Sequence, residues 1–297
     1  MKNIRDILVA SDLTTGSDVV VAGAAALAAL TGSRLHVLHI YEFHPAPYLQ
    51  SLPPAAFHDH VSALRDRLVE QLDRTVPPGV QVASKEVAVD AAQRAILSRA
   101  SQVDADLIVI GRHRPTGIAD AFLGGTADNI VRSAQVPVLI LHGPFSAPLR
   151  RVLVPIDLSE PALHALDVGV QWVGHIGAAD STPEMIVLHV IPRIFDYKDM
   201  IFDSSAVAMR LQEAIDQSCA RQHAPAGLHP YGVIRWADDT ADEIVSFVAQ
   251  ENVDLVVLGT HGYGALGRAL LGSVSSGVAR EATCPVLLVP PAMAESD

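Results

Sequence analysis

The stretch DLVVLGTHGYGALGRALLGS, residues 254–273, places a short apolar run directly before a glycine-rich segment. The apolar run, residues 255–258, has the length and composition of a strand that is buried on both faces. Five of the 15 residues at 259–273 are glycine. Glycine serves either a tight turn or a close approach of the backbone to a ligand, because it has no Cβ. The stretch therefore predicts a buried strand that opens into a turn or a binding loop.

The sequence around this stretch occurs twice in the chain. Four segments recur in the same order, at an offset near half the chain length. They are 6–13 and 151–158, 35–40 and 185–190, 103–111 and 253–259, and 135–141 and 283–289. Such a repeat indicates two copies of one domain. We predict domains at residues 1–146 and 148–297, which meet at a Pro-rich joint near residues 143–149.

Apolar runs alternate with helix-like stretches in each copy, as in an α/β protein with a parallel sheet flanked by helices. A loop and a helix, the latter from about His58 to Arg74, follow the second strand. The predicted strands are 6–11, 35–40, 81–89, 106–111 and 137–141 in the first copy, and 151–156, 185–190, 229–236, 254–259 and 285–289 in the second.

Composition limits the partners and the compartment. The 297 residues carry a formal net charge of −12, which argues against nucleic acid or an anionic membrane as the main partner. The longest apolar stretch, Val19–Leu30, is shorter than the roughly 20 residues of a membrane span. Residues 1–5 run straight into the first strand, so no signal peptide is expected. Two cysteines, Cys219 and Cys284, are typical of reduced thiols, and we expect a cytoplasmic protein.

Polar and small residues collect where the predicted strands of the second copy end. Asp157 follows strand one, Val190 closes strand two and Gly259 follows strand four. Ligands of open parallel sheets bind outside these carboxyl ends, so the three residues should line one crevice. The helix that begins at Ser273 would add unpaired N–H groups and the hydroxyls of Ser273 and Ser275 for an anion. Arg268, within the loop, either offsets phosphate charge or is solvated.

Gly259-Thr-His-Gly262, nine residues, then Gly272-Ser273 resembles the G-x2-G-x9-G-[ST] ATP-binding motif of the universal stress protein family. The strand ends at Asp157 and Val190 fit that family too, and the resemblance covers the whole chain as a tandem of two domains. It implies a Rossmann-like, five-stranded parallel sheet in the order 3-2-1-4-5 in each domain. It also implies a non-covalently bound adenine nucleotide (ATP, ADP or AMP, with Mg²⁺ left open) without fast turnover. The residues expected to bind it are Asp157 at the adenosine portion, Val190 at the adenine, and Gly259, His261, Gly262, Gly272, Ser273, Val274 and Ser275 at the ribose and phosphates.

The first copy departs from this motif. Arg114 stands at the second motif glycine and Gly125 at the hydroxyl position, with Thr126 one place later. The motif positions that it retains are Asp12, Ile40, Gly111 and Gly124. Either the first copy has lost the nucleotide and serves as a pairing surface, or Arg112 and Arg114 meet a different anion. We therefore expect nucleotide binding mainly in the second domain.

Histidines have separate interpretations. His39 and His189 occupy matching places in strand two, which favours a structural role such as a buried hydrogen bond. His113 and His261 match within the two loops and are candidate ligand contacts. His58-Asp-His60 has no third ligand at a recognisable spacing, so no metal site is expected.

The expected function is a stress-response regulatory protein that binds an adenine nucleotide. Sequence alone leaves the enzyme question open, because no set of nucleophile, base and orienting residue is recognisable. The alternatives are a slow ATPase or phosphotransfer protein, and a ligand-free interaction scaffold. Residues 137–141 and 285–289, the fifth strands, are expected to pair the two domains within the chain, and a homodimer is left open.

Overall fold

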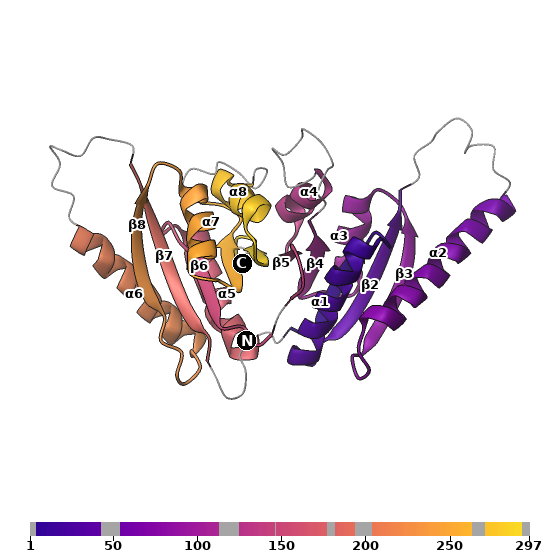
Figure 1. The fold of residues 1–297 in the computed structure, drawn as a ribbon, viewed down its shortest axis with the longest axis horizontal. Coiled ribbons are helices and arrows are strands. Elements are labelled where there is room, and N and C mark those ends of the chain that lie inside the picture. The colour runs from indigo at the N-terminus through magenta and orange to yellow at the C-terminus, as the bar shows by residue number, and fades with distance from the viewer. Residues whose placement is uncertain are drawn as a thin grey trace, which may run out of the picture. The chain divides into compact units, whose positions relative to one another are not determined.

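The computed structural model describes residues 4–42, 54–112, 125–145, 147–176, 182–193, 204–262 and 271–292. Figure 1 shows that helices and strands alternate through both halves of the chain. The first half contains β1 (Asp6–Ser11), α1 (Thr15–Thr31), β2 (Arg34–Tyr41), α2 (Pro54–Thr75), β3 (Val82–Val89), α3 (Ala92–Gln102), β4 (Leu107–Gly111), α4 (Gly125–Ser133) and β5 (Val138–Leu141). The second half contains β6 (Arg151–Pro155), α5 (Glu160–Ile176), β7 (Glu184–Pro192), α6 (Ser204–Gln222), β8 (Tyr231–Ala237), α7 (Thr240–Gln250), β9 (Leu255–Gly259), α8 (Ser273–Glu281) and β10 (Val286–Val289).

The chain divides into two compact units. The first unit is residues 3–111 with 143–145, and the second includes residues 112–142 and 146–297. Strands of the first unit lie in the order β3-β2-β1-β4, and every neighbouring pair is parallel. Strands of the second unit lie in the order β8-β7-β6-β9-β10, also parallel, and β5 pairs antiparallel with β10.

The predicted fold class is confirmed. The order 3-2-1-4-5 is found in full in the second copy and as 3-2-1-4 within the first unit. Each predicted strand agrees with the observed one to within two residues at either end, while α2 begins four residues earlier than expected. Among the described residues, no helix is both long and apolar enough to span a bilayer.

Burial explains why these runs form central strands. Val152–Val154 of β6 and Leu255–Val257 of β9 are fully buried, so both faces of these strands are covered. In the second unit α5 packs against β6 and β9 and beside α6, which contacts β7 and β8. Helix α7 packs with α8 and contacts β7 and β8. This double layer of helices leaves the carboxyl ends of the strands for a ligand.

Candidate functional site

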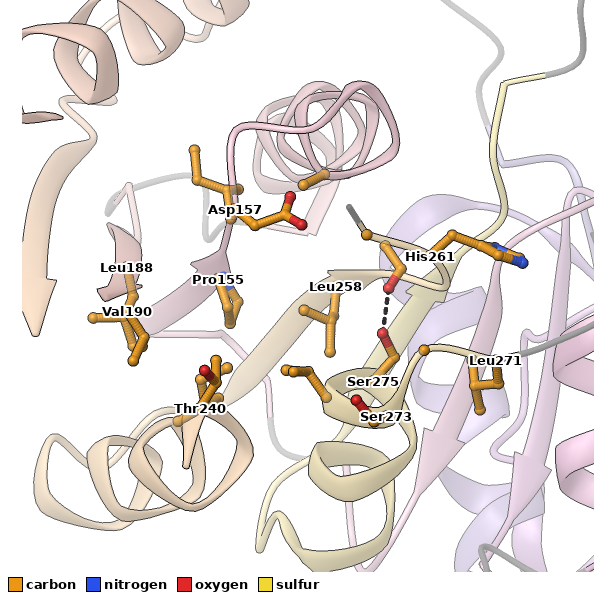
Figure 2. Close-up of a pocket in the computed structure, with 17 residues that line it drawn as sticks. Pro155, Asp157, Leu188, Val190, Thr240, Leu258, His261, Leu271, Ser273 and Ser275 are labelled. Carbon is orange, nitrogen blue, oxygen red and sulfur yellow. Dashed lines mark hydrogen bonds between the residues drawn. The ribbon is translucent and has the colours of Figure 1, made fainter. Parts of the chain in front are cut away.

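A pocket of about 340 Å³ opens at the carboxyl ends of β6, β7 and β9. Its size is at the lower end of the range for small-molecule sites, which is about 300–1,000 Å³. Figure 2 shows Asp157 on one side of the pocket and Ser273, the first residue of α8, on the opposite side, with Leu258 between them and Leu188 and Val190 to the left. The lining residues are Pro155, Ile156, Asp157, Ala162, Leu188, Val190, Thr240, Ile244, Leu258, Gly259, His261, Gly262, Leu271, Gly272, Ser273, Val274 and Ser275.

Asp157 is oriented by a tight turn directly after β6. The backbone N–H of Ser159 donates to Asp157 Oδ1 over 3.0 Å, and the Ser159 hydroxyl donates to the same oxygen. Leu158 between them has a φ of 64°, a left-handed conformation that costs a non-glycine residue roughly 1–2 kcal/mol. The turn therefore fixes a carboxylate at the pocket wall at the expense of backbone strain.

Two of the motif glycines are required by close packing of the protein itself. A Cβ added at Gly259 would lie 3.0 Å from the carbonyl oxygen of Pro161, at the start of α5. A Cβ added at Gly262 would lie 2.6 Å from Asp157 Oδ2, closer than a Cβ normally comes to another heavy atom, so the carboxylate would have to move. Gly262 thus keeps space for the Asp157 carboxylate.

Helix α8 presents its amino terminus to the pocket. Its N-cap is Gly272, which provides no side-chain cap, and the first intrahelical bond runs from Ser276 N to Gly272 O over 2.9 Å. Among the described residues, the N–H groups of Ser273, Val274 and Ser275 have no hydrogen-bond acceptor. A Cβ added at Gly272 would be in ordinary van der Waals contact with Thr260 O at 3.4 Å and Ser275 Oγ at 3.5 Å, so packing of the protein itself does not require this glycine.

Ser275 and His261 have internal roles beside the pocket. The Ser275 hydroxyl donates to the Gly259 carbonyl over 2.7 Å and ties the start of α8 to the end of β9. The His261 ring points away from the pocket (Figure 2), and its Nδ1 lies 2.8 Å from Thr260 Oγ1. Burial lowers the pKa of His261, which favours the neutral ring.

All nine residues predicted for the second domain line this one pocket. Sequence reasoning missed Thr240 and Ile244, which α7 contributes. Their signal was Asp239, which follows β8 and caps α7 by accepting from Ala241 N and Asp242 N. A helix that begins after a parallel strand starts at the same carboxyl edge as the other site residues.

The first copy keeps the aspartate turn but lacks two of the apolar residues that line the pocket of the second copy. Thr14 donates its N–H and its hydroxyl to Asp12 Oδ1, over 2.9 and 2.6 Å, and Leu13 has a φ of 60°. Ser11 and Ser17 stand where the second copy has the pocket residues Ile156 and Ala162. Both serines bond Gln71 of α2, a side chain that is 1% exposed. A buried polar network thus replaces apolar lining.

The remaining first-copy candidates are placed in part. Ile40 lies at the end of β2, and Gly111 closes β4 where a Cβ would lie 2.7 Å from Val20 Cγ2. Thr126 is exposed in the first turn of α4. Position 127, which matches Ser275, is alanine. Arg114, Gly124 and His113 lie outside the described residues.

The matched histidines of strand two have the predicted structural role. His39 Nδ1 lies 2.9 Å from the Ser11 carbonyl oxygen, and His189 Nδ1 lies 2.8 Å from that of Ile156. Each ring therefore donates to the last carbonyl before the aspartate turn, and this prediction is confirmed. Within the part of the chain that the structure describes, no three His, Cys, Asp or Glu side chains gather as a metal site.

The fold and the pocket define an open-sheet α/β protein with a ligand crevice at its strand ends. The model of the Universal stress protein family matches residues 3–142 and again 148–290, so the chain belongs to that family. A universal stress protein of Mycolicibacterium smegmatis is 26% identical over 301 residues, which cover 96% of this chain and 97% of that protein. One from Thermus aquaticus is 32% identical over 140 residues, 47% of this chain and 98% of its own. The crystal structure of a universal stress protein from Archaeoglobus fulgidus shares the fold with a TM-score of 0.71 at 19% identity, over 97% of both chains.

Proposed function

We propose that the protein is a stress-response regulator that binds ATP or a related adenine nucleotide in the pocket of residues 148–297, without fast turnover. The observation that carries the proposal is the combination of features in that pocket. An apolar slot separates a fixed carboxylate, Asp157, from the uncapped amino terminus of α8. An adenine nucleotide has a part that suits each of these features: an apolar base, hydroxyl groups and an anion.

The apolar slot suits the base. Leu188, Val190, Ile244 and Leu258 are each at most 8% exposed and face the cavity from three elements. Burial of a flat ring against such side chains stabilises the complex by about 25 cal/mol per Å² of apolar surface. The Asp157 carboxylate accepts hydrogen bonds and thereby favours the ribose hydroxyl groups over a phosphate.

The start of α8 suits the phosphate groups. Three N–H groups without acceptors among the described residues and the positive end of the helix dipole attract an anion. Ser273 is exposed beside them and can donate its hydroxyl. Backbone donors of this kind need no lysine or arginine, which agrees with an acidic chain of net charge −12.

Binding mainly in the second domain follows from the difference between the copies. The first copy places the Ser11–Gln71–Ser17 network where the second has Ile156 and Ala162. It also lacks the hydroxyl that ties Ser275 to Gly259. The sites are therefore not equivalent, and we expect one nucleotide per chain.

Calorimetric titration tests the proposal. The nucleotide-stripped protein is titrated with ATP and with AMP, and compared with Asp157→Ala and the matched Asp12→Ala. We expect one site per chain that is lost in Asp157→Ala and retained in Asp12→Ala. Two equal sites would contradict the preference for the second domain. Absence of binding by any adenine nucleotide would contradict the proposal and favour the ligand-free scaffold, and rapid phosphate release that Asp157→Ala abolishes would favour the ATPase.

A further inference from the structure

Three polar side chains form a hydrogen-bonded series near the amino ends of three strands in the first unit. They are Asp6 at the start of β1, His36 on β2 and Ser84 on β3. Strand register places Leu8 opposite His36, and His36 opposite Ser84. Asp6 is two residues before Leu8, and side chains two apart on a strand share a face, so Asp6, His36 and Ser84 lie on one face of neighbouring strands. His36 Nε2 lies 2.9 Å from Asp6 Oδ1, and His36 Nδ1 lies 2.8 Å from Ser84 Oγ.

Charge fixes the direction of these hydrogen bonds. Arg34 donates to Asp6 Oδ2 over 2.7 Å. Burial opposes the Asp6 charge, but the hydrogen bonds from Arg34 and His36 outweigh it and lower the pKa of Asp6. An ionised carboxylate only accepts, so His36 donates from Nε2. In the neutral ring Nδ1 is then the acceptor for the Ser84 hydroxyl, which is the order of nucleophile, base and orienting carboxylate.

The surroundings favour reaction at Ser84. Arg99 of α3 donates to Ser84 Oγ over 2.9 Å and also pairs with Glu86 over 3.2 Å. A guanidinium beside the hydroxyl stabilises negative charge as the hydroxyl loses its proton. Asp6 and His36 are 4% and 7% exposed, whereas Ser84 is half-buried on β3, the outermost strand of the unit. The base is thus sheltered and the nucleophile is accessible.

The second copy shows which part of this cluster the fold needs. Arg151 and Glu184 form an ion pair at 2.6 Å in the places of Asp6 and Arg34, with the charges exchanged. Ile186 stands in the place of His36, and Tyr231 in the place of Ser84. The ion pair at the strand starts therefore recurs, while the histidine and serine are particular to the first copy. Packing of the fold does not require them.

We infer that Ser84, with His36 as base and Asp6 as orienting group, is a nucleophile that accepts an acyl group from small activated acyl esters. Ser84 Oγ attacks the carbonyl carbon and gives its proton to His36 Nδ1. The bond from that carbon to the leaving oxygen breaks, and His36 returns the proton to this oxygen. Water then attacks the acyl-serine, passes a proton through His36 to Ser84 Oγ, and releases the carboxylic acid.

The first test uses the full-length protein and p-nitrophenyl acetate, with nitrophenolate release and the intact mass followed together. We expect a transient acetyl adduct on Ser84. Nitrophenolate release in Ser84→Ala and His36→Gln should be at least about 100-fold slower, as for loss of a nucleophile or a general base.

A matched variant controls this test. Ser101→Ala removes an exposed serine of α3 outside the series, and it should react as the parent does. Equal nitrophenolate release from Ser84→Ala and the parent, or an adduct spread over other serines, would overturn the inference.

A second measurement applies where a substitution alters folding. Ser84→Cys replaces the Ser84 hydroxyl with a thiol on the same Cβ. Iodoacetamide alkylates the thiolate, so the alkylation rate of this cysteine reports whether His36 takes up its proton. We expect alkylation to be slower when His36→Gln is added to Ser84→Cys, in samples with matching circular dichroism. Equal alkylation rates in the two proteins would contradict activation by His36.

Discussion

At the scale of the residue, Gly262 is placed where any side chain would meet the site's carboxylate. Its Cα lies so that an added Cβ is 2.6 Å from Asp157 Oδ2, while Asp157 Oδ1 is held by Ser159. The glycine of the motif therefore has a structural reason that spacing alone did not reveal. The sequence indicated a close approach of backbone to phosphate, and the structure adds a close approach to the protein's own aspartate.

Gly262→Ala tests this close approach. We expect nucleotide affinity to fall by at least about 10-fold, because the new methyl group displaces the Asp157 carboxylate from the pocket wall. Calorimetric titration measures the change. Gly125→Ala is the matched control, since a Cβ there meets nothing within 4 Å. Affinity in Gly262→Ala equal to that of the parent would show that Asp157 does not contact the ligand.

His164 gives a pH dependence to folding. Burial lowers the pKa of His164 on α5, against a smaller opposite effect of Asp167. Below about pH 6.5 the His164 side chain binds a proton more readily in the unfolded chain than in the folded one. Its contribution to the free energy of unfolding is therefore complete above that pH and falls as the pH decreases toward the folded pKa. His164→Gln should therefore lose less free energy of unfolding between pH 7.5 and 5 than the parent.

Urea unfolding at the two pH values measures this difference. His229→Gln, at an exposed position, is the control and should keep the parent's pH dependence. If His164→Gln destabilises the protein equally at both pH values, the residue acts through packing and not through its proton.

At the scale of the element, helix α8 is anchored to the strand that precedes it. Ser275 is 5% exposed, and its hydroxyl donates to the Gly259 carbonyl across the loop. Ser275→Ala should lower the free energy of unfolding by about 1–3 kcal/mol, because a buried carbonyl loses its donor. Chemical denaturation measures the loss. Ser273→Ala, exposed in the same turn, should change stability by no more than about 0.5 kcal/mol, and an equal loss in both would refute the anchor.

The elements were predictable because their signals are local. Runs such as residues 152–154 and 255–257 are apolar at every position, and the repeat supplied a second copy of each pattern. The pocket was predictable where a residue directly follows a strand, as Asp157 does. Thr240 was missed although Asp239 marks the start of α7 after a strand, whereas the residues of the Asp6–His36–Ser84 series come together only through strand register. His36 is 30 residues from Asp6 and 48 from Ser84 in the sequence.

At the scale of the whole molecule, the fifth strand of the first repeat lies in the second compact unit. Val138–Leu141 pairs antiparallel with β10, with Leu139 opposite Leu287, and both side chains are fully buried. His142 extends this link: its Nδ1 lies 2.8 Å from the Cys284 carbonyl oxygen and its Nε2 lies 2.9 Å from that of Ala279. A carbonyl oxygen only accepts, and either ring nitrogen of His142 can donate to the carbonyl beside it.

The link predicts which unfolding transition a substitution in the first repeat affects. Leu139→Ala should lower the stability of the second unit by about 2–5 kcal/mol, since it removes a fully buried side chain beside β10. A ligand of residues 148–297 raises the midpoint of the same transition, because it binds only the folded form. In scanning calorimetry, the transition whose midpoint ATP raises should be the one whose midpoint Leu139→Ala lowers.

Leu35→Ala is the control. Leu35 is equally buried, on β2 of the first unit, and its loss should lower the midpoint of the other transition. A shift of the ATP-sensitive transition by Leu35→Ala but not by Leu139→Ala would place β5 with the first unit.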